Sequence, residues 1–167
     1  FAEKFPERFI ELGVAEQNMA TVAAGIANYG KIPFISSYAV FSPGPNNEQI
    51  RTTICINNVP VKIGGAHAGV SVGPDGATHQ ALEDIALMRV LPRMTVLVPC
   101  DAIEARKATV AAAFHPGPAY IRFGREKSPV FTTEETPFQI GRAEIFRQGK
   151  DAAIIGCGML LHNALIA

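Results

Sequence analysis

The alternation of strand-like and helix-like segments is the feature that most constrains the fold of this chain. Short segments rich in β-branched and aromatic residues recur along the first 125 residues, and stretches with helically spaced apolar residues separate them. Parallel neighbouring strands need helical crossovers, so this alternation is typical of a parallel sheet with helices on both faces. The sequence therefore predicts an α/β fold.

The expected elements follow from this pattern and from turn and cap signals. We expect strands at residues 8–14, 32–41, 59–64, 95–99 and 119–123. We expect helices at residues 15–29, 48–57, 82–89 and 101–113. Gly30 provides the stop for the first helix, and Asp101 with Glu104 three residues later forms a variant of the capping box for the last.

The loss of periodicity after residue 125 indicates a domain boundary. We expect a first domain over residues 1–125, which can lack its first strand, and a linker over residues 126–140. Residues 143–146 and 152–155 predict a hairpin that opens a second α/β domain over residues 141–167. The chain begins with Phe rather than Met and ends inside an apolar stretch, so we expect a fragment with a truncated second domain.

Composition narrows the classes of partner. Fifteen Lys and Arg residues balance fifteen Asp and Glu residues, so charge gives no sign of nucleic acid or membrane binding. No apolar run approaches the roughly 20 residues that span a bilayer. The three cysteines are far apart and form no C-x-x-C pair, which disfavours a disulfide framework or a zinc site. We expect a cytoplasmic protein whose partners are small molecules or other proteins.

Glu16 is the first candidate functional residue. It lies where a predicted strand gives way to a helix, in the run Gly13-Val14-Ala15-Glu16-Gln17, and ligands of open parallel sheets bind at the carboxyl ends of strands. An acid at a helix N-terminus is also favoured by the helix dipole alone, by about 0.3–1 kcal/mol. The position by itself leaves both interpretations open.

The glycine-rich stretch at residues 64–80 is the second candidate. It contains His67, Asp75 and His79, and its glycines match neither the P-loop nor the dinucleotide fingerprint. A loop of this length in a compact domain is usually functional, although a flexible loop that happens to contain histidines is the alternative. The irregular spacing disfavours a metal triad, so we predict no metal site in this chain.

Arg122 is the third candidate, at the end of a predicted strand and followed closely by Arg125. The arginine guanidinium suits bidentate recognition of phosphate or carboxylate, but a surface arginine is the common case. The presence of Arg122 alone therefore does not indicate a function.

The three stretches together resemble the transketolase family of thiamine-diphosphate enzymes. The run from Gly13 to Gln17 resembles the family's glycine, two residues and glutamate at the pyrimidine site. The run Asp75-Gly76-Ala77-Thr78-His79-Gln80 is similar to its substrate loop, and order and spacing agree over about residues 7–130. The resemblance implies a pyrimidine-binding domain, followed by the start of the family's C-terminal domain.

The resemblance also implies cofactor roles. Glu16 would hydrogen-bond the ring nitrogen of the aminopyrimidine and favour its imino form, which then takes the proton from C2 of the thiazolium. Phe41 matches the aromatic residue that stacks on the pyrimidine, although an ordinary core phenylalanine is the alternative. The family's other two pocket aromatics fall at Gly44 and Asn47, so we expect Tyr38 to serve in their place.

By the same resemblance, four residues would handle the substrate. His67 and Arg122 would hold a sugar phosphate, and Asp75 would contact a substrate hydroxyl. His79 would lie near the donor carbonyl and polarise it. The implied reaction is transfer of a two-carbon ketol unit between phosphorylated sugars in the pentose phosphate pathway, and His67 favours a transketolase over a deoxyxylulose-phosphate synthase.

One family motif is absent from this sequence. The G-D-G stretch that, with a distant asparagine, holds the diphosphate through Mg²⁺ or Ca²⁺ does not occur. We therefore expect a partner domain or N-terminal subunit to bind the diphosphate and the metal, in a homodimer or heterotetramer. The resemblance thus implies that this chain is the C-terminal subunit of a split transketolase or a piece of a longer one. Three alternatives stay open: a 1-deoxyxylulose-5-phosphate synthase-like enzyme, a 2-oxo-acid dehydrogenase beta-like enzyme, or a non-catalytic assembly subunit.

Overall fold

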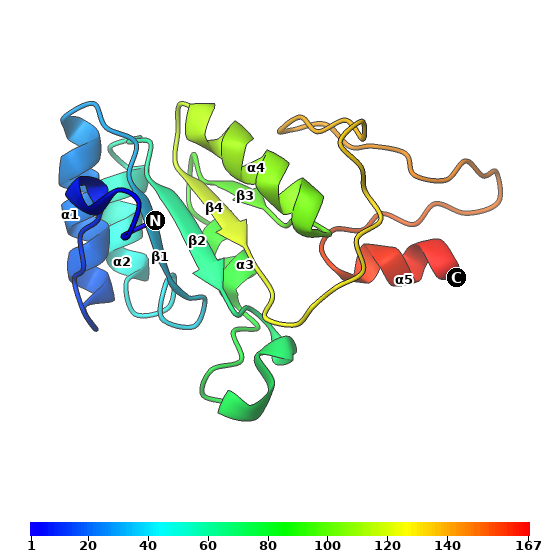
Figure 1. The fold of residues 1–167 in the computed structure, drawn as a ribbon, viewed down its shortest axis with the longest axis horizontal. Helices are drawn as coiled ribbons and strands as arrows, with labels where there is room; N and C mark the ends of the chain where they lie inside the picture. Colours follow the sequence, from blue (N-terminus) through cyan, green and yellow to red (C-terminus); the bar gives the residue numbers. More distant parts are fainter.

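A four-stranded parallel sheet forms the centre of the molecule, and the computed structural model describes all 167 residues (Figure 1). The strands are β1 (Phe34–Tyr38), β2 (Lys62–Ala66), β3 (Thr95–Leu97) and β4 (Ala119–Arg122). They lie in the order β1-β2-β4-β3, and every neighbouring pair is parallel. The predicted α/β fold with a parallel sheet is confirmed.

Helices connect the strands and extend the chain beyond them. The helices that connect or precede the strands are α1 (Glu16–Asn28), α2 (Asn47–Gln49), α3 (Asp84–Arg89) and α4 (Ala102–Phe114). A π-helical segment, η2 (Ile50–Cys55), continues α2. Short 3-10 turns are η1 (Pro6–Arg8) and η3 (Val70–Asp75), and α5 (Leu160–Ile166) lies near the C-terminus.

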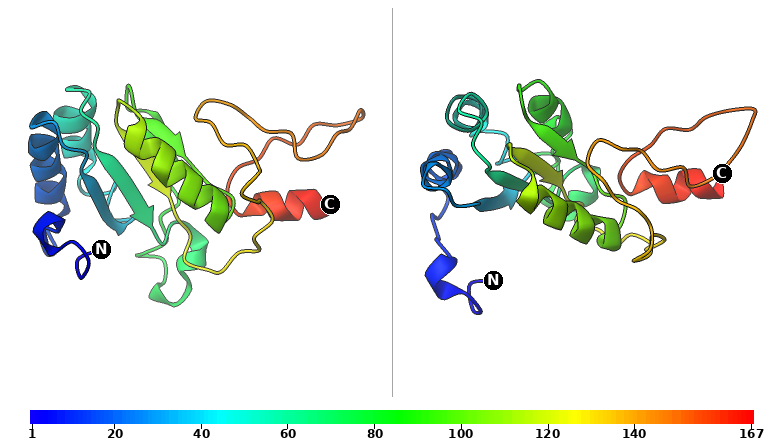
Figure 2. Two further views of the ribbon diagram at one scale, coloured as in Figure 1. Left: turned by 45° about the horizontal axis from the view of Figure 1, so that its top comes forward. Right: turned by 90° about the horizontal axis from the view of Figure 1, so that it is seen from above.

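The helices cover both faces of the sheet. On one face, buried alanines of α1 join Ile35 and Ile63 of the strands in the main core, together with residues of η2 and α3. On the other face, Ala112 of α4 packs with Ala119 and Ile121 of β4. Seen from above in Figure 2, α3 and α4 accordingly lie on opposite sides of the sheet.

Helix α1 agrees with the prediction to within one residue at each end. Small side chains let it lie close to β1, and its alanines at positions 20, 23, 24 and 27 are buried. Gly30 follows the helix with φ of 76°, a left-handed conformation that favours glycine. Gly30 was therefore a sufficient sequence signal for the end of this helix, whereas its start at Ala15 has no side-chain cap.

Two local predictions are wrong. Residues 8–14 form no strand, and residues 143–146 and 152–155 form no hairpin. Isolated strands lack hydrogen-bond partners, and the apolar residues Phe9, Ile10, Ile145, Ile154 and Ile155 in these segments are exposed. The sequence also gave no clear signal for α5, which lies within the segment assigned to the second domain.

Asp101 caps α4 and also fastens the segment after β4 to the domain. One carboxylate oxygen accepts hydrogen bonds from the Glu104 N–H at 2.9 Å and the Thr132 hydroxyl at 2.7 Å. The other oxygen accepts from the N–H groups of Phe131 and Thr132. Burial opposes ionisation, but these hydrogen bonds outweigh it and lower the pKa of Asp101.

We predict that Asp101→Ala lowers the free energy of unfolding by about 2–4 kcal/mol, because a helix cap and several buried hydrogen bonds are lost together. Urea denaturation at pH 7 measures the difference. Asp101 has a lowered pKa when folded, so its contribution is present above its unfolded pKa of about 3.9 and is lost as the pH falls. The exposed Asp151→Ala is the control, and equal losses in the two variants would contradict the prediction.

Candidate functional site

The register of the sheet brings the candidate residues to one edge. Tyr38 pairs with Ala66 at the ends of β1 and β2, and Gly65 pairs with Arg122 at the ends of β2 and β4. Because the strands are parallel, the residues that follow them emerge on the same side. In Figure 1 the green loop after β2 and the segment after β1 both lie at this lower edge.

Glu16 is held at this edge by contacts to two other segments. Its side-chain Oε1 accepts a hydrogen bond from the Ser37 hydroxyl at 3.0 Å, so the start of α1 is joined to the residue before Tyr38. Its backbone oxygen accepts from Asn46 Nδ2 at 3.1 Å. Asn46 is fully buried and also donates to the Ser42 hydroxyl at 3.0 Å. The Glu16 carboxylate is therefore half-buried and fixed beside β1.

Four rings predicted from the sequence lie together at the edge of the sheet. Tyr38 stacks on His67 with centroids 4.4 Å apart and planes 9° apart. Phe41 lies 6.1 Å from Tyr38 in a stacked arrangement. His79 meets Phe41 edge-on at 5.3 Å and Tyr38 edge-on at 6.0 Å. The structure thus brings both predicted aromatics and both predicted histidines into one group, which we call the ring cluster.

The loop at residues 67–80 carries the two histidines on a fixed base. Ala68 donates its N–H to the Phe123 carbonyl, and Gly69 donates to the Ala81 carbonyl, both at 2.9 Å. His67 adopts a left-handed backbone with φ of 56°, and its Nδ1 is buried without a partner. His79 Nδ1 lies 2.9 Å from the Thr78 hydroxyl. The loop is therefore anchored where it leaves β2 and extends beyond the sheet edge.

The two arginines after β4 have different partners. Arg122 Nε donates to Asp84 Oδ2 at 2.9 Å, and its side chain is 21% exposed. Arg125 donates to the Val72 carbonyl at 2.6 Å and to Asp75 Oδ2 at 3.2 Å, with its side chain 36% exposed. Asp75 thus pairs with Arg125, while Arg122 points to a carboxylate inside the domain.

Sequence reasoning missed the polar residues that support the site. Asp84 is buried, and it accepts a hydrogen bond from the Tyr120 hydroxyl at 2.7 Å as well as the one from Arg122. Burial and the neighbouring Asp84 charge raise the pKa of Tyr120, so this hydroxyl remains a donor. Ser37 and Asn46 were also missed. A lone acid at a helix start, a serine and an asparagine carry no sequence signal that distinguishes them from ordinary surface residues.

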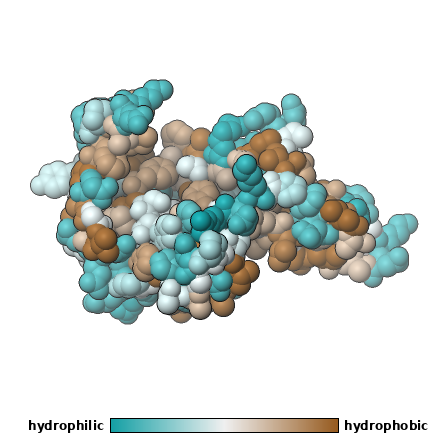
Figure 3. All heavy atoms as spheres, turned by 60° about the horizontal axis from the view of Figure 1, so that its bottom comes forward, coloured by the Kyte–Doolittle hydropathy of each residue, from teal (hydrophilic) through white to brown (hydrophobic).

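The face of the molecule that carries this edge is mixed in polarity. In Figure 3, hydrophilic residues gather over its centre, and separate hydrophobic patches flank them. No group of three or more His, Cys, Asp or Glu side chains is placed to hold a metal ion. None of the helices combines the length and hydropathy that crossing a membrane requires.

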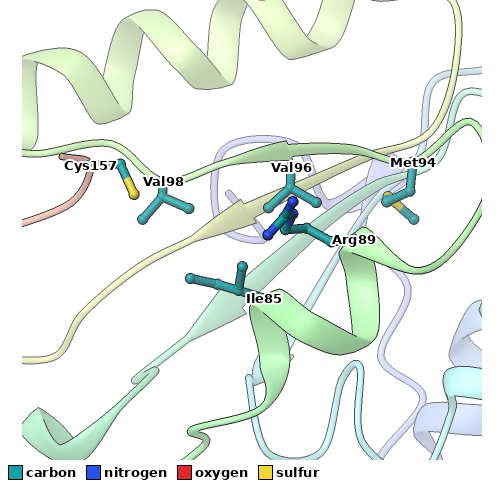
Figure 4. A pocket seen from close by; sticks show the side chains of 6 residues that line it. All are labelled: Ile85, Arg89, Met94, Val96, Val98 and Cys157. Atoms are coloured by element: carbon teal, nitrogen blue, oxygen red, sulfur yellow. The ribbon is translucent and has the colours of Figure 1, made fainter. Parts of the chain in front are cut away.

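A cavity of about 550 Å³ lies elsewhere, between α3 and β3 (Figure 4). It is lined by Ile85, Arg89, Met94, Val96, Val98 and Cys157. Its lining has one cation and no carboxylate or imidazole. This cavity therefore lacks the acid–base groups that gather at the lower sheet edge, and we assign the site to that edge.

The fold and the site define a parallel α/β domain that presents a carboxylate, flat rings and arginines at the carboxyl ends of its strands. The family described as "Transketolase, pyrimidine binding domain" matches residues 1–130. The chain belongs to this family. Membership implies thiamine diphosphate as the cofactor.

Individual relatives are chains of split transketolases. A protein of Methanocaldococcus jannaschii described as a transketolase C-terminal section is 43% identical over the whole chain, which covers 54% of that protein. A 6-deoxy-6-sulfo-D-fructose transketolase subunit of Clostridium sp. strain MSTE9 is 36% identical over the whole chain, which covers 52% of it. The chain thus spans about half the length of these curated relatives.

A solved structure supports the same conclusion. The split-gene transketolase in an inactive β4 tetramer has a TM-score of 0.90 to this chain and 46% sequence identity. The similarity covers 99% of this chain and 53% of that one. The expected resemblance to split transketolase C-terminal subunits is therefore confirmed.

We predict that Gly65→Ala destabilises the domain by about 1–3 kcal/mol, because overpacking a closed core has that cost. A Cβ at Gly65 would lie 2.1 Å from the Tyr120 hydroxyl, and Tyr120 is fully buried. Gly64→Ala is the matched control, since its Cβ would meet its nearest atoms at 3.5 Å. Denaturant unfolding of both variants measures the effect, and equal stability of the two would contradict it.

Proposed function

We propose that this chain supplies the pyrimidine-side half of a thiamine-diphosphate-dependent transketolase site that transfers a two-carbon ketol unit between phosphorylated sugars. One observation carries the proposal: the half-buried Glu16 carboxylate is fixed through Ser37 at the same edge of the sheet that carries the ring cluster. A carboxylate and flat rings at one edge suit a flat heterocycle with a ring nitrogen.

The residues at this edge fit an aminopyrimidine. Tyr38 and Phe41 offer ring faces, and Glu16 offers a carboxylate oxygen to a ring nitrogen. Two buried polar atoms of the surrounding residues, Asn46 Oδ1 and His67 Nδ1, have no partner within the chain. When bound, thiamine diphosphate supplies the carbon nucleophile that ketol transfer requires.

Each residue has a role that its position supports. Glu16 holds or shares a proton with the pyrimidine nitrogen, and the Ser37 hydroxyl orients its carboxylate. His79 lies against Phe41, where it can polarise the donor carbonyl. In the substrate region, His67 and Arg122 hold the sugar phosphate in this proposal, and Asp75 contacts a substrate hydroxyl.

Arg125 joins the substrate region in this proposal. Its guanidinium is more exposed than that of Arg122, and it already contacts Asp75. Two arginines near one loop suit a tetrahedral oxyanion, which phosphate and sulfonate share. The sulfosugar named in the relative from Clostridium shows that family members differ in this substituent.

A partner is part of the proposal. The chain lacks the G-D-G motif, so we infer that a diphosphate-binding domain or N-terminal subunit holds the diphosphate through Mg²⁺ or Ca²⁺. The inactive β4 tetramer of the similar split-gene transketolase supports the need for a second subunit. Assembly in the cytoplasm suits the three free cysteines of the chain.

The reaction class is tested on the assembled enzyme. Xylulose 5-phosphate with an aldose acceptor is compared with pyruvate and the same acceptor, with sugar products measured. Turnover of the ketose phosphate supports the proposal. Turnover of pyruvate alone would favour a decarboxylating relative, and no turnover with either donor would favour a non-catalytic assembly subunit.

We predict that Glu16→Gln lowers kcat of the assembled enzyme by about 10²–10⁴-fold, because a proton-transfer group is lost while its size is kept. Steady-state turnover of the ketose phosphate measures the effect. Glu48→Gln, at an exposed position on α2, is the control and should retain activity. If Glu16→Gln stays within about tenfold of the unchanged enzyme, Glu16 is not the activating acid.

We predict that Arg122→Met and Arg125→Met each raise KM for xylulose 5-phosphate by about tenfold or more, because a charge-assisted hydrogen bond is worth about 1.5–3 kcal/mol. Hydroxypyruvate, a ketol donor without phosphate, should show a change below about threefold in the same variants. Arg89→Met, at the cavity of Figure 4, is the control. An equal rise in KM for both donors would show that the substituted arginine does not bind the phosphate.

A further inference from the structure

Asp84 is a buried carboxylate outside the residues assigned to cofactor or substrate. It begins α3, is 1% exposed, and accepts both of its hydrogen bonds at a single oxygen, Oδ2. The other oxygen, Oδ1, is buried without a partner. Burying a carboxylate costs free energy unless it is paired, so its single ionic partner, Arg122, dominates its environment.

Arg122 links this carboxylate to the loop that carries His67 and Asp75. Its Nε donates to Asp84 Oδ2, and its terminal Nη2 lies beside Gly69. A Cβ at Gly69 would be only 2.9 Å from Nη2, and Gly69 has φ of 80°. The guanidinium therefore occupies the space that the missing side chain leaves, directly under the first turn of the loop.

The other loop contacts lie on the same segment of chain. The Phe123 carbonyl accepts from the Ala68 N–H, and Arg125 contacts the Val72 carbonyl and Asp75. Residues 122–125 thus hold the loop at three successive places. Of these supports, only the guanidinium of Arg122 is itself held by a buried charge.

We propose that Asp84 is a positioning residue that fixes Arg122 under Gly69 and so sets the loop at residues 67–80 for substrate binding. The expected change in KM rests on the proposed function. The expected change in the order of the loop does not depend on that function. Loss of the Asp84 charge leaves the Arg122 guanidinium without its ionic partner. The loop, with His67 and His79, then loses its inner support, while Glu16 keeps its contacts to Ser37 and Asn46.

The test uses Asp84→Asn in the assembled enzyme, an isosteric change that removes the charge. We expect faster amide hydrogen exchange in peptides covering residues 67–80 and unchanged exchange in peptides covering α4. We also expect KM for xylulose 5-phosphate to rise about tenfold. The double variant with Arg122→Met should be no worse than Arg122→Met alone, because both changes act through one guanidinium.

Tyr120→Phe is the matched control, since it removes the other hydrogen bond to the same Asp84 oxygen and leaves the Arg122 pair intact. We expect this variant to lose stability without faster loop exchange or a higher KM. Unchanged loop exchange in Asp84→Asn, the same loop effect in Tyr120→Phe, or fully additive effects with Arg122→Met would each overturn the proposal. If the unmodified enzyme does not turn over the ketose phosphate, the proposed function fails, and the exchange data still decide the role of Asp84.

Discussion

The parallel pairing of β1, β2 and β4 is the constraint on which the candidate site depends. Their register places Tyr38 level with Ala66, and Gly65 level with Arg122. Parallel strands release their chains at the same edge, so segments separated by tens of residues in sequence become neighbours there. The contact between Tyr38 and His67 at 4.4 Å is a direct consequence of this register.

Small residues and buried polar groups determine which side chains meet at that edge. Gly65 leaves room for the Tyr120 hydroxyl, which reaches Asp84, and Gly69 leaves room for Arg122. On the other side of the edge, Asn46 binds the backbone oxygen of Glu16. Buried polar groups are costly unless they are paired, so these contacts hold the loops and the helix start in one arrangement. The exposed functional groups are thereby supported from within the domain.

The sequence predicted well those features that local signals control. The C-terminal end of α1 and the Asp101 cap of α4 follow from Gly30 and from the Asp-x-x-Glu spacing, which act within a few residues. The predictions failed at residues 8–14 and 143–155, where apolar, β-branched segments were taken for strands. A strand requires a partner from elsewhere in the chain, and no local signal reports whether one is present.

The site likewise combines features that the sequence predicts with features that only the tertiary structure determines. The sequence by itself identified Glu16 and the histidine-containing loop as candidates from residue type and position, and its resemblance to the transketolase family added Phe41 and Tyr38. Only the tertiary structure decided that Arg122 faces the buried Asp84 and that Arg125 faces Asp75. Such pairings join residues about 38 and 50 positions apart. They depend on strand order and register, which arise when the whole sheet assembles and not from any one segment.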